Sequence, residues 1–244
     1  MENSIINNLF ELWELIGINS KFLQTTKTYS WVKPEYNSWP SKIFDLKPTE
    51  TNFKQLFSDI EAGILPNSIS ILENEDLEAS LVQNNFILKS TVKGMYLDLK
   101  QKDKPIDDFD SIEIVNNETK AIEFAKIASL SFGYEVLSST IIPLINSSRL
   151  KIFIGKYNKH YASCGIVLLD TNGISGLHMI GTIPEYRGLG IGKIMTEKLL
   201  LECFKNKSKQ AVLVASVSGE RIYSKMGFVA QGNLKSYSIN LKNS

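Results

Sequence analysis

The sequence predicts an α/β (α+β) protein, because strand-like and helix-like segments alternate along most of its length. Two further observations support this class. A glycine-rich segment at 183–195 runs directly into a helical apolar pattern, and a pattern of residues at 81–99 recurs at 223–241. With 244 residues, of which 43% are hydrophobic and 22% charged, the chain can form one large domain or two small ones.

The C-terminal part of the sequence predicts an unbroken series of elements. Apolar runs between turn residues predict strands, and apolar residues spaced three and four apart predict helices. The expected strands are at 111–115, 150–157, 161–170, 174–183, 211–216 and 234–241. The expected helices are at 117–133, at 135–147, from the glycine-rich segment to about 206, and at 219–228. Pro143 should bend or end the second helix, because proline removes a backbone donor.

The N-terminal part predicts fewer elements, in the order strand, helix, strand and helix. They are expected at 41–46, 50–63, 68–72 and 75–86. Phe86 and Leu99 have counterparts in Phe228 and Leu241, since 228 minus 86 and 241 minus 99 both give 142. We interpret this offset as an internal repeat, and an unrelated α/β extension is the alternative. The polar stretches 100–110 and 116–120 are the candidate linkers.

Residues 183–195, IPEYRGLGIGKIM, place three glycines within five positions before a helix. A dinucleotide fingerprint needs G-x-G-x-x-G and a later acidic residue, and this segment has neither. A nucleoside-triphosphate P-loop is excluded as well, because Arg187 stands at its first glycine position and Ile194 follows Lys193. A turn that only caps a helix and a different kind of phosphate-binding loop remain.

Two motifs carry a resemblance to the GNAT acyltransferase superfamily. Arg187, Gly190 and Gly192 match its Arg-x-x-Gly-x-Gly signature for acetyl-coenzyme A. The segment SVSGERIYSKMGF resembles its final motif, in which a tyrosine, here Tyr223, lies four residues before a Gly-Phe pair at Gly227. The resemblance covers roughly 109–244. It implies the GNAT acyl-CoA N-acyltransferase fold, with a mixed, mostly antiparallel central sheet flanked by helices, preceded here by a smaller GNAT-like α/β segment.

The resemblance and the repeat together predict two domains. Residues 109–244 would form a catalytic GNAT N-acetyltransferase domain, and residues 1–105 a degenerate GNAT-like domain. The offset of 142 places Leu81 where the second copy has Tyr223, and it places 45–50, which contains no glycine, near the glycine loop. The N-terminal domain is therefore expected to lack a coenzyme A site and to supply a sheet edge and one wall of a substrate cleft.

The resemblance implies acetyl-CoA as co-substrate and assigns residues to it. The main chain of 180–182 would pair with the pantetheine arm and offer an N–H to the thioester oxygen. The loop and the helix after it would bind the pyrophosphate through backbone N–H groups and the positive helix end. Ser216 stands where many relatives carry Asn. The expected cofactor-binding residues are Ile180, Gly181, Thr182, Arg187, Gly188, Leu189, Gly190, Ile191, Gly192, Lys193 and Ser216.

The resemblance also implies catalytic and acceptor residues. Tyr223 would act as general acid to the departing CoA thiolate, and a core tyrosine is the alternative. His178 is a candidate general base, since imidazole ordinarily titrates near pH 6.5, with a water chain or an unidentified Glu as alternatives. Tyr134 and Glu135 fall where GNAT enzymes shape the acceptor pocket, although they can equally belong to an ordinary loop.

We therefore expect an N-acetyltransferase (EC 2.3.1.-) that moves the acetyl group of acetyl-CoA directly to a primary amine of a small molecule or peptide. A non-catalytic acyl-CoA sensor and a scaffold of paired domains are the alternatives. Retention of Tyr223 favours catalysis, because a sensor has no need of a proton donor. The expected oligomeric state is a monomer or a homodimer.

Composition limits the other partners. The 27 basic and 26 acidic residues show no long basic run, which disfavours nucleic acid. No apolar run approaches about 20 residues and the N-terminus does not resemble a signal peptide, so we expect no membrane partner and a cytoplasmic location. Two cysteines in apolar segments predict no disulfide framework, and two histidines are too few for a metal cluster, so no metal is expected.

Overall fold

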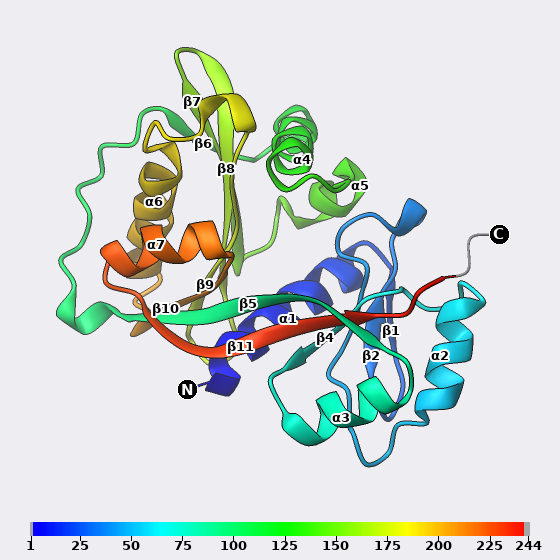
Figure 1. Ribbon diagram of the computed structural model, residues 1–244. Helices are drawn as coiled ribbons and strands as arrows, with labels where there is room; N and C mark the ends of the chain where they lie inside the picture. The colour runs from blue at the N-terminus through cyan, green and yellow to red at the C-terminus, as the bar shows by residue number, and fades with distance from the viewer. Residues whose placement is uncertain (1, 242–244) are drawn as a thin grey trace.

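The computed structural model describes residues 2–241, and the strands in this range form one continuous sheet (Figure 1). The strands are β1 (Leu23–Thr25), β2 (Ser30–Val32), β3 (Lys42–Phe44), β4 (Ile69–Leu72), β5 (Ile87–Asp98), β6 (Ile112–Ile114), β7 (Leu150–Tyr157), β8 (His160–Leu169), β9 (Ser175–Thr182), β10 (Gln210–Ala215) and β11 (Val229–Ser238). Their order across the sheet is β1-β2-β3-β4-β11-β5-β10-β9-β8-β7-β6. The mixed and mostly antiparallel sheet expected from the GNAT resemblance is confirmed.

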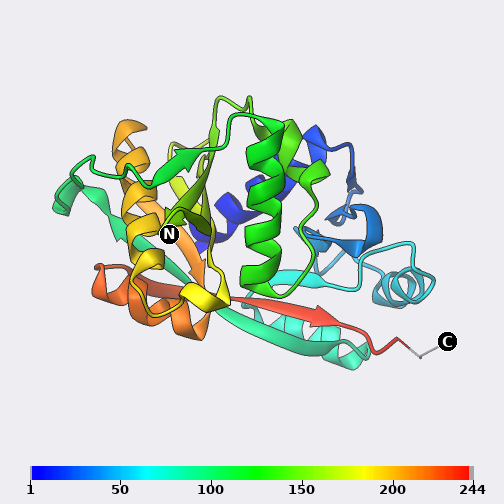
Figure 2. The same cartoon turned by 90° about the horizontal axis from the view of Figure 1, so that it is seen from above.

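Helices cover both faces of the sheet, which gives three layers (Figure 2). The helices are α1 (Glu2–Asn19), α2 (Phe53–Glu61), α3 (Glu75–Gln83), α4 (Glu118–Phe132), α5 (Ser138–Ile141), α6 (Ile191–Lys205) and α7 (Val217–Lys225). Short 3-10 turns are η1 (Glu35–Asn37), η2 (Leu99–Gln101), η3 (Ile142–Leu144) and η4 (Pro184–Tyr186). One core packs α1, α4 and α5 on one face, and two smaller cores pack α6 with α7 and α2 with α3 on the other.

The repeat proposed from the sequence appears as repeated elements. Helix α3 and helix α7 have the same length and are offset by 142 at both ends, since 217 minus 75 and 225 minus 83 agree. Strands β5 and β11 begin at the same offset. In both halves a parallel pair precedes this helix, β3 with β4 and β9 with β10. The N-terminal half is therefore GNAT-like in structure.

The last strands of the two halves are exchanged in the centre of the sheet. β11, from the C-terminal half, pairs with β4 of the N-terminal half, and β5 pairs with β10. β5 and β11 also pair with each other, so both strands lie at the centre of the sheet. The boundary predicted between 105 and 109 lies in the connection from η2 to β6 and stays a prediction.

The predicted elements differ from the structure in three places. Helix α1 and strands β1, β2 and β5 are not among the predicted elements. β11 begins at Val229 rather than at 234, because it pairs with β5 from that residue onward. The helix expected over 135–147 is split into α5 and η3, and Pro143 lies at the start of η3.

Local sequence explains where several helices begin and end. Asn74 caps α3 by accepting a hydrogen bond from the Leu77 N–H, and Ser216 caps α7 by accepting one from the Gly219 N–H. The two caps are themselves 142 positions apart. Gly133 ends α4 in the left-handed conformation, where a residue without Cβ is favoured.

Candidate active site

The site is built around a separation of two parallel strands. β9 pairs with β10 only at Ser175 with Ala211 and at Gly176 with Val212. Beyond these pairs the strands separate, so one edge of 177–182 has no neighbouring strand. Met179 has a left-handed backbone, with φ of 50°, and the pairing of β8 with β9 changes register nearby. Such a bulge redirects the strand after it, and bulges are frequent beside active sites.

The glycine loop lies at the end of the separated strand. Gly188 and Gly190 have φ of 81° and 77°, and a Cβ at either position would meet no atom within 4 Å. These glycines are required by backbone conformation, and the space beside them is open. Gly190 caps α6 without a side-chain hydrogen bond, so the first backbone N–H groups of α6 remain available to a ligand. Gly192 lies beside Thr182, at the end of β9.

The basic side chains of the loop are partly engaged within the protein. Arg187 donates through Nε to the Thr182 carbonyl at 3.2 Å and through a terminal nitrogen to the Ser131 carbonyl at 2.7 Å. Arg187 therefore ties the loop to β9 and to the end of α4. Lys193 lies 3.5 Å from Glu197, one turn along α6. Both side chains remain exposed at the molecular surface.

Tyr223 lies on α7 with its ring in the core beside Phe228. The residue is 8% exposed, and its hydroxyl makes no hydrogen bond to any described residue. Burial raises the pKa of the phenol to about 12, so it carries its proton at neutral pH. A Cβ on Gly219 would lie 3.0 Å from the Tyr223 ring, so glycine at this position makes room for the ring.

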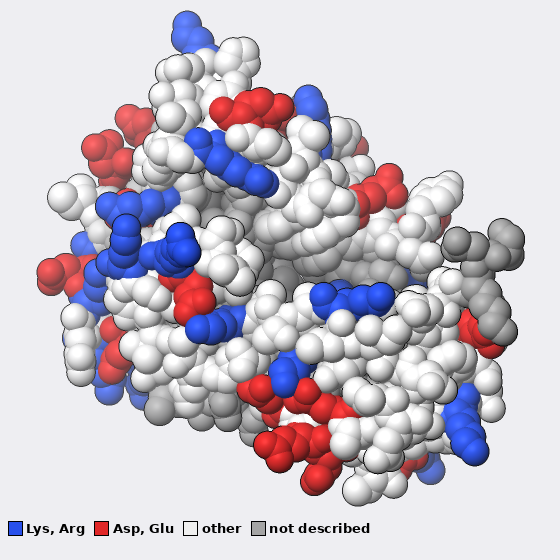
Figure 3. Space-filling view, viewed as in Figure 1, with Lys and Arg blue, Asp and Glu red and all other residues white. Residues whose placement is uncertain are grey.

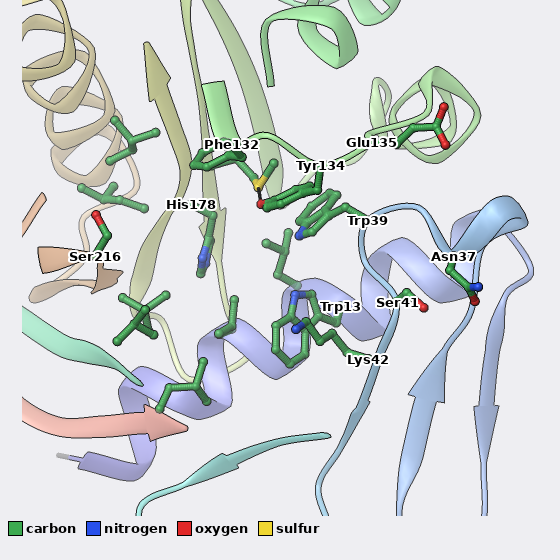
Figure 4. Close-up of a pocket in the computed structure, with 18 of the residues that line it drawn as sticks. Trp13, Asn37, Trp39, Ser41, Lys42, Phe132, Tyr134, Glu135, His178 and Ser216 are labelled. Carbon is green, nitrogen blue, oxygen red and sulfur yellow. Dashed lines mark hydrogen bonds between the residues drawn. The ribbon is translucent and has the colours of Figure 1, made fainter. Parts of the chain in front are cut away.

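A cavity of about 510 Å³ passes between the separated strands (Figure 4). Tyr223 and Leu177 come from the core under α6 and α7, whereas Leu12 and Trp13 come from the core around α1, so the lining includes both faces of the sheet. It is mostly apolar. The cavity is lined by Leu9, Leu12, Trp13, Asn37, Trp39, Ser41, Lys42, Val92, Phe132, Tyr134, Glu135, Leu177, His178, Met179, Ile180, Val214, Ser216, Tyr223 and Leu234.

His178 is in the cavity wall and is held by helix α1. Its Nε2–H donates to Asn8 Oδ1 at 2.8 Å, and the Asn8 amide donates in turn to Asp170 and to the Ile174 carbonyl. Because both Asn8 amide hydrogens go to acceptors, Asn8 presents its oxygen to His178, which fixes the tautomer with the proton on Nε2. Burial lowers the pKa of the imidazole to about 3, which makes it a weak base.

The two predicted acceptor residues occupy different parts of the cavity. Tyr134 stacks on Phe132, and its hydroxyl lies 3.8 Å from the Met179 sulfur. The residue is 44% exposed, yet its hydroxyl end is withdrawn from solvent, and this burial raises the pKa of the phenol. Glu135 is exposed, and Figure 4 shows its carboxylate directed away from Tyr134 and His178. Its carbonyl accepts a hydrogen bond from the Trp39 backbone N–H at 2.8 Å.

The cavity thus brings together some of the sequence-predicted residues and leaves out others. Tyr223, Ser216, Ile180, His178, Tyr134 and Glu135 line it. Gly181, Thr182 and the loop residues 187–193, all of them described, do not line it. Trp13, Trp39 and Lys42 line it and were not predicted, because nothing in their local sequence marks them and only the fold places them beside β9.

Charge is distributed unevenly over the two halves. In Figure 3, Lys and Arg side chains gather over α6 and α7, and Asp and Glu gather over α3. Within the described part of the chain there is no group of three or more His, Cys, Asp or Glu side chains placed to hold a metal ion. None of the described helices is long and apolar enough to cross a membrane.

Comparison with known proteins identifies the class. Residues 131–237 match the family described as "Acetyltransferase (GNAT) domain". This segment runs from the end of α4 into β11 and contains the glycine loop and Tyr223. Residues 131–237 are therefore similar in sequence to a GNAT domain. No curated protein is significantly similar to the chain in sequence.

Solved structures show that the GNAT fold extends over nearly the whole chain. A GCN5-related N-acetyltransferase from Kribbella flavida is similar at a TM-score of 0.70 with 15% identity, covering 96% of each chain. One from Sphaerobacter thermophilus has a TM-score of 0.59 with 12% identity, covering 92% of this chain and 84% of its own. A tandem GNAT protein from the clavulanic acid biosynthesis pathway has a TM-score of 0.60 with 10% identity, covering 88% and 79%.

Proposed function

We propose that the protein is an N-acetyltransferase that moves an acetyl group from acetyl-CoA to a primary amine of a small molecule or peptide. The observation that carries the proposal is the meeting of Tyr223 with the unpaired edge of β9 in one cavity. The GNAT domain supports the same reading, because this family uses acetyl-CoA. A monomeric or homodimeric state stays a prediction.

Several features of the structure are suited to binding acetyl-CoA. Open space beside Gly188 and Gly190 allows close approach to the backbone, and the N-terminus of α6 favours an anionic group. The unpaired edge of 177–182 presents main-chain donors and acceptors to an extended arm. These groups would hold the pyrophosphate and the pantetheine arm, respectively. When bound, acetyl-CoA supplies an acetyl group activated as a thioester.

The protein's own residues then have separate tasks. Tyr223 holds a proton on its hydroxyl oxygen at neutral pH and can deliver it to the sulfur that departs. The backbone N–H groups after the Met179 bulge would stabilise a developing oxyanion. Ser216 is engaged as the cap of α7 and borders the same cavity. His178, with its lowered pKa and its bond to Asn8, is better suited to holding α1 against β9 than to accepting a proton.

A non-catalytic acyl-CoA sensor is the second candidate. A sensor would need the glycine loop to bind the cofactor, but it would not need the Tyr223 hydroxyl as a proton donor in the cavity. The cavity also continues past Tyr223 to the α1 side of the sheet, where Trp13 and Lys42 lie, and a second substrate can enter there. A sensor needs no such space.

Tyr223→Phe separates the two candidates. General acid catalysis contributes about 10² to 10⁴ in rate, and a lost hydroxyl hydrogen bond costs only about 0.5 to 1.5 kcal/mol of affinity. We expect kcat for thiol release, screened over amino acids, peptides and polyamines, to fall at least about tenfold, while the acetyl-CoA Kd from calorimetry changes much less.

Tyr237→Phe is the matched control. Tyr237 is also buried, and its hydroxyl donates to Glu78 at 2.8 Å; neither residue lines the cavity. Its loss should lower the free energy of unfolding by about 1 kcal/mol and leave kcat unchanged. Equal losses of kcat and of acetyl-CoA affinity in Tyr223→Phe would make Tyr223 a binding residue. Acetyl-CoA binding with no turnover on any amine would favour the sensor.

A further inference from the structure

Lys42 brings a positive charge from the N-terminal half into the cavity. It lies on β3, and Figure 4 shows its side chain extending toward α1 and Trp13. Its Nζ donates to the Ser68 hydroxyl at 2.6 Å. An ammonium group has three hydrogens to donate, so this single bond leaves capacity for a further acceptor.

No carboxylate neutralises Lys42 within the described residues, since none lies within 4 Å of its Nζ. Glu14 on α1 and Asp45 after β3 form no ion pair with Lys42. Burial, together with Asp45 and Glu11, raises the pKa of Glu14. Burial lowers the pKa of Lys42 to about 8, because its charge is withdrawn from water with no opposite charge beside it. A buried charge of this kind is stabilised by an opposite charge.

Two indole groups add neutral donors to the lining of the same cavity. Trp13 is 4% exposed, and its Nε1–H is buried without an acceptor. Trp39 lines the cavity, and Figure 4 shows its ring nitrogen directed toward the cavity. Such unpaired donors favour an acceptor atom in the ligand over an apolar one. The rest of the lining is apolar, from residues such as Leu9, Leu12 and Val92.

The geometry points to a carboxylate-binding subsite at Lys42, so that the acceptor is an amine with an apolar body and a carboxylate at the opposite end, as in an apolar ω-amino acid. This inference rests on the proposed function and names its substrate class. The carboxylate would lie against Lys42 on the α1 side, and the amine would face the separated strands near Tyr223. The N-terminal half would thereby select the acceptor.

Carboxylate binding at Lys42 can be measured without turnover and without acetyl-CoA. A failed transfer assay would therefore count against the proposed function and not against this subsite. The probes are 4-phenylbutyrate and 4-phenylbutanamide, which share a body, lack an amine and differ only in the head group, an anionic carboxylate against a neutral amide. Trp13 and Trp39 report binding through their fluorescence. We expect the full-length protein to bind the carboxylate at least tenfold more tightly than the amide.

Lys42→Met should reduce this preference to less than threefold while leaving the amide affinity unchanged. Lys54→Met, the same change at an exposed α2 lysine, should keep the preference. The inference is overturned if the wild type binds both probes equally or binds neither, or if Lys42→Met keeps the preference. In the transfer assay, 6-aminohexanoate should likewise be preferred over 6-aminohexanamide at neutral pH, and only when Lys42 is present.

Discussion

The two halves of the chain share a fold and differ where a parallel strand leaves its partner. β9 continues from its last pairing at Gly176 to Thr182, whereas β3 ends at Phe44, one residue after the pairing of Ile43 with Ile69. The N-terminal half therefore lacks the free strand edge that borders the cavity. A groove in this fold requires a strand that continues beyond its last paired residue. The shared order of strands and helices does not by itself provide such a strand.

In the N-terminal half, the positions that correspond to the proposed site leave no space for a ligand. Leu81, the counterpart of Tyr223, is fully buried in a core with Ile43 and Ile69. The loop at 45–52 contains no glycine. Helix α3 carries three acids and no base, whereas α7 carries Arg221 and Lys225 with one acid. An anionic cofactor is therefore disfavoured by both sterics and charge.

The exchange of β5 and β11 explains why both halves are needed. Each half completes its part of the sheet with a strand from the other, so neither half has its final strand within its own sequence. Helix α1 also belongs to both, since Asn8 bonds to Asp170 and His178 of the C-terminal half. We propose that the C-terminal half holds acetyl-CoA and that the N-terminal half holds the acceptor.

The largest expected difference between the halves concerns acetyl-CoA affinity. Gly190 and Gly63 both have left-handed backbones, with φ of 77° and 71°, and both face open space. Valine at either position should cost about 1 to 2 kcal/mol of stability, because a Cβ is disfavoured there. We expect Gly190→Val to raise the acetyl-CoA Kd in calorimetry at least 100-fold and Gly63→Val to leave it within about twofold. Similar effects of the two changes would reduce the loop to a helix cap.

A smaller effect should appear as a pH dependence of carboxylate binding. The charged form of Lys42 is the binding form, so affinity for 4-phenylbutyrate should be full between about pH 6 and pH 8, where the probe's carboxylate is also ionised. Above pH 8 it should fall by up to about tenfold per unit. Of the other titratable groups in the cavity, His178 stays neutral, and burial keeps Tyr134 and Tyr223 protonated. Glu135 is exposed at the edge. The amide probe should show no such fall, and a parallel fall would contradict the assignment to Lys42.

Much of the fold and part of the site could be predicted because the signals were local. The spacing of Gly190 and Gly192 and of Tyr223 and Gly227 is set within single turns and one helix. The strand limits 150–157 were correct because apolar residues fill that whole strand between turns.

The rest depends on long-range contacts. The Met179 bulge is formed by an ordinary residue in a strand-like run, and no local pattern marks it. The exchange of β5 and β11 is invisible in sequence, because either pairing would satisfy the same alternation. Lys42 resembles any strand lysine until α1 and Ser68 enclose it. The repeating apolar residues Ile5, Leu9, Leu12 and Ile16 could have predicted α1.

Hydrogen exchange of the full-length protein with and without acetyl-CoA tests the division between the halves most directly. We predict slower exchange at 177–193 and 216–223 when acetyl-CoA is added, because the β9 edge and the α6 N-terminus would gain hydrogen-bond partners. The counterparts at 45–52 and 74–81 should not change. Protection of those N-terminal segments, or no protection at the glycine loop with acetyl-CoA in excess, would contradict the account.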